Sequence, residues 1–243
     1  MKVLAGGCRV YSPADGEVSA QGNRTARAVV NAASGARHIT QTVSEYAPGM
    51  SPLVANASAE EVLYVASGEA ACIISTGDST RFPLRPGAAV YIPPGTAYNI
   101  ENAGPDTLRI VSSCCPLRTS KTGPPALVHE DQREEIRAGQ DRVFRYLVHT
   151  DLGCEHVTQF VGWIPKSKAP FHKHTYEEVI YILDGRGILH LEEHLAAGEF
   201  GPGTSIYLPA GVVHCLENPH PEPVRLLGVF YPSGSPAAAY END

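Results

Sequence analysis

The chain has 243 residues, a net charge of −7 at pH 7, and as many as 20 prolines and 23 glycines. This length can form one large domain or two small ones, and the many turn-forming residues favour short strands over helices. The acidic balance and the lack of a Lys/Arg cluster argue against a nucleic-acid partner, and no apolar run approaches the roughly 18–20 residues that span a membrane.

The beginning of the chain predicts little regular structure. Residues 1–25 contain the turn-rich stretches SPADGE and SAQGN. The opening MKVLAGGC resembles a lipoprotein cleavage site, but too few apolar residues precede Cys8 for a signal peptide. We therefore expect a cytoplasmic protein whose six cysteines, which form no CxxC pair, are buried and unpaired.

One sequence plan occurs twice along the chain. RHITQ at 37–41 recurs as EHVTQ at 155–159, displaced by 118 residues, and EEVLYVASG at 60–68 recurs as EEVIYILDG at 177–185, displaced by 117. Both copies consist of strand-like runs bounded by turn residues. The chain is therefore predicted to be an internal duplication and all-β, with two tandem barrels.

The duplication predicts the domain boundaries. We expect an N-terminal barrel over residues 1–115, a linker over 116–140 and a C-terminal barrel over 141–243. The linker begins with Pro-rich, extended sequence. Its stretch HEDQREEIRAG predicts one or two helical turns ending at Gly139. The C-terminal SGSPAAAYEND is expected to be flexible or to lie on a partner.

Four residues of the second copy have metal-ligating chemistry. His172 and His174 are two apart and share a face of an extended segment, and Glu178 follows at the start of a strand. His214 follows the tight turn Pro-Ala-Gly. Three neutral imidazoles and one carboxylate can hold a divalent first-row metal and leave positions open for substrate. With ordinary imidazole pKa values of about 6.5, affinity should fall below about pH 6.

These stretches resemble the paired motifs of the cupin superfamily. The first motif has the form HxH(x)3E(x)6G, and its positions are filled by His172, His174, Glu178 and Gly185. The second has the form G(x)5PxG(x)2H(x)3N, and its positions are filled by Gly203, Pro209, Gly211, His214 and Asn218. The resemblance implies a bicupin, with two germin-like double-stranded β-helix (jelly-roll) barrels. It also implies that His172, His174, Glu178 and His214 bind the metal. The alternative is a barrel that has lost its metal.

The first copy lacks most of this chemistry. Depending on where a one-residue gap lies, the positions of His172 and His174 hold either Val54 and Asn56 or Ala55 and Ala57. The position of His214 holds Tyr98, whereas Glu61 matches Glu178. We predict one divalent transition metal per chain (Fe, Mn, Ni, Zn, Co or Cu), in the C-terminal barrel. A weak second site at Glu61 and Tyr98 is the alternative.

Other polar residues of the second copy compete for a role. His190 and His194 have HxxxH spacing, which on a helix would suggest zinc, but they follow a Gly-x-Gly turn and are predicted to lie in a hairpin. Gln159 and Trp163 share one strand face, which either lines the pocket or packs outside it.

The resemblance leaves several functions open, because cupins perform many reactions. We favour a metal-dependent oxidoreductase, such as a dioxygenase, acting on a small molecule. The alternatives are a non-redox hydrolase, isomerase or decarboxylase, and a small-molecule-binding protein with a structural metal. Ureidoglycine aminohydrolases are similar in plan, but that family has an acidic first ligand and Gln at the position of His214. We also expect a homodimer, since exposed sheet edges need covering.

Overall fold

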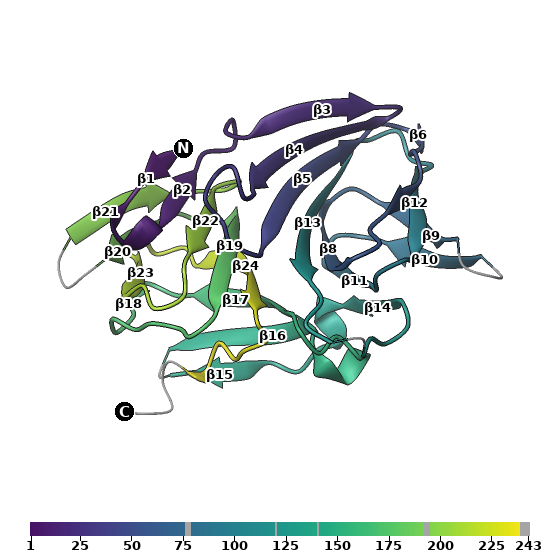
Figure 1. Ribbon diagram of the computed structural model, residues 1–243. Helices are drawn as coiled ribbons and strands as arrows, with labels where there is room; N and C mark the ends of the chain where they lie inside the picture. Colours follow the sequence, from purple (N-terminus) through teal and green to yellow (C-terminus); the bar gives the residue numbers. More distant parts are fainter. Residues whose placement is uncertain (76–78, 120, 140, 192–194, 239–243) are drawn as a thin grey trace.

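The chain folds into two β-barrels that lie side by side (Figure 1). The structure, a computed structural model, describes residues 1–75, 79–119, 121–139, 141–191 and 195–238. Within these residues no helix combines the length and apolar character needed to cross a membrane. The predicted all-β class and the two tandem barrels are confirmed.

The N-terminal barrel is made of two antiparallel sheets. The larger sheet has the strand order β14 (Ala126–His129), β11 (Ala88–Ile92), β8 (Ala59–Ser67), β13 (Leu108–Pro116), β5 (Thr40–Tyr46), β4 (Arg24–Val30) and β3 (Glu17–Gln21). The smaller sheet has the order β10 (Thr80–Leu84), β9 (Ala70–Ile74), β12 (Ala97–Asn102) and β6 (Gly49–Met50), and β7 (Val54–Ala55) also pairs with β12.

The C-terminal barrel repeats this plan. Its larger sheet has the order β1 (Lys2–Val3), β2 (Arg9–Tyr11), β22 (Ser205–Leu208), β19 (Glu177–Asp184), β24 (Val224–Tyr231), β17 (Thr158–Ile164), β16 (Arg142–Val148) and β15 (Ile136–Ala138). Its smaller sheet has the order β18 (Ser167–Lys168), β23 (His214–Asn218), β20 (Gly187–Leu191) and β21 (Leu195–Phe200). Short 3-10 helices are η1 (Ala5–Gly7), η2 (Glu130–Gln132) and η3 (Thr150–Leu152).

The structure departs from two predictions of local structure, one wholly and one in part. Residues 1–25 are not irregular: they contain β1, β2 and β3, and β2 pairs with β22 of the C-terminal barrel, with Arg9 opposite Tyr207. The expected helical turns before Gly139 are limited to η2, because strands β14 and β15 flank it and add to the edges of the two large sheets. Both errors have one cause: sheet edges recruit short segments whose own sequence signal is weak. The domain boundaries remain a prediction.

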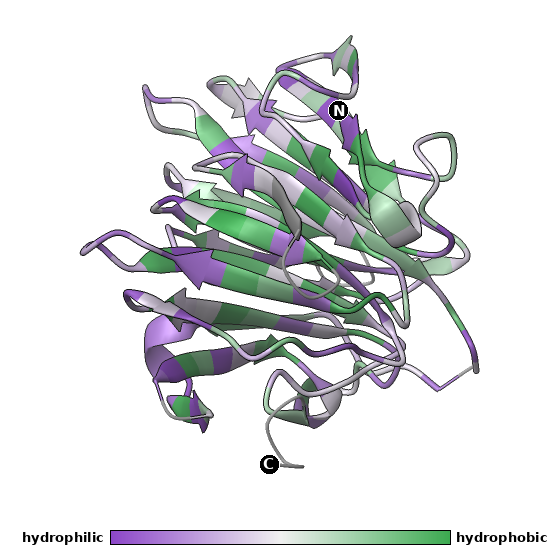
Figure 2. Ribbon diagram, turned by 90° about the vertical axis from the view of Figure 1, so that its left-hand side faces the viewer, coloured by the Kyte–Doolittle hydropathy of each residue, from purple (hydrophilic) through white to green (hydrophobic). Residues whose placement is uncertain are grey.

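The central strands are buried on both faces. On β19, Ile180 and Ile182 point into the C-terminal barrel, whereas Val179 and Tyr181 join a cluster between the two barrels. β8 alternates in the same way between the N-terminal core and this shared cluster. Hydrophobic and hydrophilic segments alternate along many strands in Figure 2. Because each fully buried large apolar side chain contributes about 1.5–3 kcal/mol, the shared cluster stabilises the pairing of the barrels.

The duplication also produces matched polar contacts across the barrel interface. In the N-terminal barrel, Glu60 accepts a hydrogen bond from Tyr91 Oη at 2.6 Å and lies 3.0 Å from Nδ1 of His156, which belongs to the C-terminal copy. The repeat-equivalent Glu177 lies 2.9 Å from Nδ1 of His38, which belongs to the N-terminal copy. Each barrel therefore presents a histidine to a buried carboxylate of the other.

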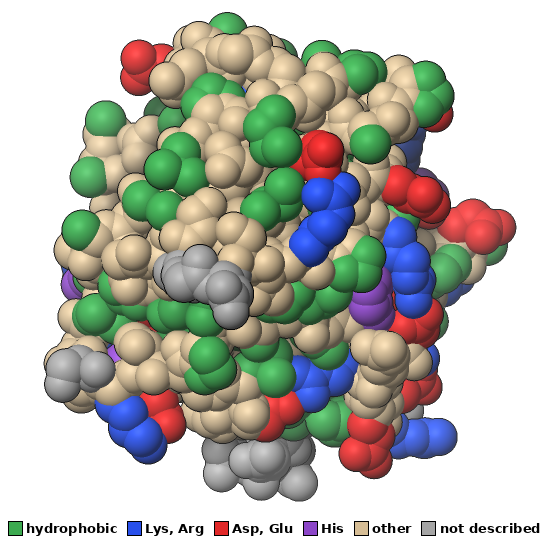
Figure 3. Space-filling model, turned by 90° about the vertical axis from the view of Figure 1, so that its right-hand side faces the viewer, with side chains coloured by type: hydrophobic (Ala, Val, Ile, Leu, Met, Phe, Trp, Pro, Cys, Tyr) green, Lys and Arg blue, Asp and Glu red, His purple; other side chains and the backbone are tan. Residues whose placement is uncertain are grey.

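The cysteines agree with the expectation from composition, and the surface carries side chains of both charges. All six cysteines are free, and five are buried, with Cys114 half-buried. On the face shown in Figure 3, basic and acidic side chains lie next to each other, and hydrophobic side chains are scattered among them.

Candidate metal centre

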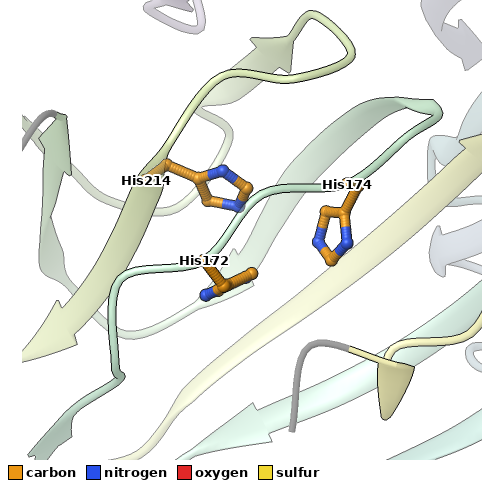
Figure 4. Close-up of side chains that lie close together, drawn as sticks. All are labelled: His172, His174 and His214. Carbon is orange, nitrogen blue, oxygen red and sulfur yellow. The ribbon is translucent and has the colours of Figure 1, made fainter. Parts of the chain in front are cut away.

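Backbone hydrogen bonds join the two motif stretches of the C-terminal barrel. His172 and His214, the first residue of β23, form a bridge in which each backbone amide donates to the other carbonyl, at 3.0 and 2.9 Å. The amide of Gly211 donates to the carbonyl of His174 at 2.8 Å. Gly211 has a φ of +83°, a left-handed conformation that favours glycine at this turn. The pairing brings the three imidazoles together, as Figure 4 shows.

Three of the four predicted ligands form one cluster, and the fourth, Glu178, lies beside two of them. One ring nitrogen from each of His172, His174 and His214 lies within 4.8 Å of the others. Glu178 Oε2 lies 3.6 Å from Nε2 of His174 and 3.7 Å from Nε2 of His214. Within the described parts of the chain, these histidines form the one group of three or more ligand-type side chains with atoms this close.

Two of the imidazoles are held in the tautomer that suits a metal ligand. Nδ1 of His172 lies 3.0 Å from the carbonyl oxygen of Pro170, and Nδ1 of His214 lies 3.0 Å from that of Val212. An Nδ1–H donated to a carbonyl leaves the lone pair on Nε2 and fixes the direction of the ring. The third ring, that of His174, is stacked on Tyr176 at 4.8 Å between centroids.

Burial shifts every titratable group of the centre toward its neutral form. Burial, aided by the neighbouring imidazoles, lowers the pKa of His174 and of His214 to about 3, and burial also lowers the pKa of His172. Burial raises the pKa of the Glu178 carboxyl to about 8. The pKa values of the three histidines therefore lie below the ordinary imidazole value of about 6.5. Neutral imidazoles around a buried carboxyl fit a divalent cation, which would offset the cost of ionising Glu178.

The centre opens into a small, mostly apolar cavity of about 80 Å³. Besides His172, His174, Glu178 and His214, its lining comprises Ala138, Arg142, Val143, Phe144, Phe160, Gly162, Trp163, Ile164, Ile180, Leu216, Leu226, Phe230 and Pro236. Trp163 is thus part of the lining, whereas Gln159, which shares its strand face, is not. Sequence reasoning did not identify Arg142, whose place at the start of β16 gives no motif signal.

The C-terminal segment covers part of this cavity. Tyr176 Oη donates to the carbonyl oxygen of Ser235 at 2.9 Å, Tyr146 Oη donates to Ser235 Oγ at 3.0 Å, and Pro236 lines the cavity. The described part of the segment, up to residue 238, is therefore packed on its own barrel, contrary to the expectation for the tail. Residues 239–243 lie outside the described residues.

The equivalent place in the N-terminal barrel has different chemistry. Val54 is paired with Tyr98 as His172 is with His214, and the amide of Gly95 donates to the carbonyl of Asn56 at 2.7 Å. Of the two alignments, the structure therefore selects Val54 and Asn56. Glu61 is buried, and burial raises its pKa, although hydrogen bonds from Tyr98 and Ser112 oppose this shift.

His190 and Cys215 lie away from the centre. His190 is on β20, in the predicted hairpin with β21, and its Nε2 lies 2.7 Å from Oε2 of Glu217. His194 lies outside the described residues. Cys215 is buried, with its Sγ 3.0 Å from the carbonyl oxygen of Ala169, so it points away from the imidazoles as strand alternation predicts.

Comparison with protein families gives one matching model. The model described as "Cupin domain" matches twice, at residues 42–114 and 159–230, which together make up more than half of the chain. An uncharacterised protein of Methanocaldococcus jannaschii, MJ1618, is 40% identical over 67 residues, which are 27% of this chain and 52% of that protein. The match thus spans about half the length of this curated relative.

Solved structures with the same fold are distant in sequence. A protein named as glyoxylate-induced from Pseudomonas aeruginosa has a TM-score of 0.80 at 19% identity, covering 96% of this chain and 92% of that one. YlbA of E. coli has a TM-score of 0.79 at 16% identity, covering 95% and 93%. Oxalate decarboxylase OxdC of Bacillus subtilis has a TM-score of 0.76 at 15% identity, covering 91% and 76%. At these identities the likeness concerns the fold.

Proposed function

Given that the chain belongs to the cupin family and has two cupin domains in tandem, we propose that it is a metal-dependent enzyme acting on a small molecule. The metal is a single divalent transition ion in the C-terminal barrel, bound by His172, His174, Glu178 and His214. The observation that carries this proposal is a cluster of three neutral imidazoles, two of them oriented by backbone carbonyls, with the buried carboxyl of Glu178 beside it on the lining of one cavity.

We further propose oxidoreductase chemistry of the dioxygenase type. Among the described residues that line the cavity, the four proposed ligands include every side chain that could transfer a proton near neutral pH. The other lining residues are apolar, apart from Arg142. A site with no separate acid or base suits a reaction in which a bound ion would supply the activation of substrate and oxygen.

The chain's own residues have defined roles in this proposal. His172 and His214 are fixed by their carbonyl partners, so they present Nε2 to the ion without reorganisation. Glu178 supplies the negative charge. The walls formed by Phe144, Phe160 and the neighbouring apolar residues exclude water, which strengthens the electrostatic interactions inside the cavity.

The second candidate is non-redox chemistry, in which the ion acts as a Lewis acid for decarboxylation, hydrolysis or isomerisation. The fold likeness to oxalate decarboxylase, a protein with Mn(II) centres, favours this candidate. The third candidate is a binding protein with a structural metal. The three differ in measurable ways, because only the first consumes oxygen and only the first two turn over a substrate.

The test is reconstitution of metal-stripped protein with Mn, Fe(II), Co, Ni, Cu and Zn in turn, under air and under nitrogen. We expect oxygen uptake with diketone or catechol-like compounds for one redox-active ion only. Glu61→Gln is the matched control for Glu178→Gln, since the two glutamates occupy equivalent positions in the two copies. Equal turnover with zinc and without oxygen would overturn the dioxygenase proposal and favour the Lewis-acid candidate.

We also propose that the protein is a homodimer. The support is general: sheet edges need covering, and the described edge strands β3, β10 and β21 end the order of their sheets. Light scattering should give twice the 26.0 kDa of one chain, and a monomer at micromolar concentration would contradict this proposal.

A further inference from the structure

One cavity residue is not explained by metal binding. Arg142 lies at the start of β16 and lines the cavity together with the four proposed ligands. Its side chain is only 9% exposed. Phe144, two residues along the same strand face, is also part of the lining, so Arg142 places a cation on an otherwise apolar wall.

The guanidinium of Arg142 is held in place but its charge is poorly compensated. Nη2 donates to the carbonyl oxygen of Leu216 at 2.8 Å, and Nε is buried with no hydrogen-bond partner. The carboxylate of Asp141 lies 3.8 Å from Nε, beyond hydrogen-bond distance, and is 45% exposed. By contrast, the guanidinium groups of Arg109 and Arg133 lie 2.6 and 2.5 Å from their carboxylates.

The contact with Leu216 also places the guanidinium against β23, the strand that begins at His214. Leu216 is two residues after His214 on β23, so both residues lie on the same face of the strand. Arg142 and His172 line the same cavity, and the positive charge of Arg142 adds to the main effect of burial in lowering the pKa of His172. A divalent ion balanced only by Glu178 would leave further positive charge in the same cavity.

We propose that Arg142 binds the carboxylate of a small organic acid, whose other end reaches the metal centre. A planar guanidinium matches the two oxygens of a carboxylate, and an apolar cavity of this size admits only a short carbon chain. The metal part of this inference rests on the proposed function, whereas the contact between Arg142 and the anion does not.

The experiment uses trifluoroacetate as a probe, followed by 19F NMR with the full-length chain, both zinc-loaded and metal-stripped. We expect trifluoroacetate to bind both forms, and trifluoroacetamide to bind at least 10-fold more weakly. The substitution Arg142→Met should weaken the binding of trifluoroacetate at least 10-fold in both forms. Arg142→Lys, which keeps the charge but not the fork, should retain intermediate affinity. Thermal melts establish that each variant is folded, and Arg142→Lys serves as the test if Arg142→Met is not.

Several results would overturn the inference. The first is equal binding of trifluoroacetate and trifluoroacetamide, and the second is unchanged binding of trifluoroacetate in both Arg142 variants. The third is competition by inorganic phosphate as strong as that by acetate, because this would indicate a general anion site. Manganese-loaded protein locates the probe, because bound trifluoroacetate should then show strong paramagnetic relaxation. Loss of Arg142-dependent binding with one metal still bound per chain would refute this inference alone. If the protein binds no metal but still binds trifluoroacetate in a way that depends on Arg142, only the proposed function is refuted.

Discussion

Replacing Glu178 by Gln is expected to stabilise the metal-free protein at neutral pH while destroying its metal site. Burial raises the pKa of the Glu178 carboxyl from 4.5 to about 8 in the folded chain. The stability contributed by this group is therefore fully present below about pH 4.5 and is lost as the pH rises through 8. Gln has a similar shape and never ionises, so the variant avoids this loss.

The size of the effect follows from the two pKa values. At pH 7 the unfolded Glu178 is about 2.5 pH units above its pKa, and each unit is worth about 1.4 kcal/mol, so the loss is about 3 kcal/mol. This is a large part of the roughly 5–15 kcal/mol that stabilises a typical domain. The buried histidines do not interfere near pH 7, because the lowered pKa of His174 and His214 costs stability only below about pH 6.5.

The assay is urea unfolding of metal-stripped protein between pH 4.5 and 8. The advantage of Glu178→Gln should rise from near zero to about 3 kcal/mol at pH 7. Glu61→Gln should gain less, because Tyr98 and Ser112 donate hydrogen bonds to its carboxylate and favour the charged form. With saturating zinc the order should reverse, since only the wild-type centre gains binding energy. A pH-independent difference, or equal gains in the two variants, would refute the reasoning.

Three further predictions concern packing, the interface and the centre. Gly185→Ala should cost several kcal/mol in thermal unfolding, and Gly211→Ala only about 1 kcal/mol. Both glycines have a positive φ, but an added Cβ would lie 2.6 Å from a backbone oxygen at Gly185 and would have nothing within 4 Å at Gly211. Equal costs would contradict this reasoning. Glu60→Ala should cost about 2–4 kcal/mol in urea unfolding, since it leaves Tyr91 and His156 without their buried acceptor, and a change below about 0.5 kcal/mol would show that the contact is unimportant. His174→Ala should lose bound metal by elemental analysis yet keep its circular dichroism spectrum, and complete unfolding would show that the metal is structural.

The sequence predicted the fold and the gathering of the site because both depend on local spacing. His172 and His174 share a face at any strand register, and the turn ending at Gly211 returns the chain to pair with them. The duplication was visible because each copy keeps its turn glycines and a pair of consecutive glutamates. In each pair, one glutamate faces its own barrel and the other faces the neighbouring barrel. Strand alternation alone is enough to explain this division.

What the sequence could not predict depends on contacts between distant segments. β2 joins the C-terminal barrel because the edge of β22 is open, and nothing within residues 9–11 specifies that partner. Arg142 resembles any surface arginine until the fold brings its side chain to the backbone of β23. The lowered histidine pKa values likewise arise from burial by Phe230 and other residues that are far away in the sequence.

The central claim, one metal ion in the C-terminal barrel, is tested most directly by anomalous diffraction from crystals of protein reconstituted with manganese or zinc. We predict one peak per chain, about 2.0–2.3 Å from a ring nitrogen of each of His172, His174 and His214 and from an oxygen of Glu178. No peak is expected at Glu61. A second peak beside Glu61 and Tyr98, or a fully reconstituted protein with no peak at the three imidazoles, would contradict the account.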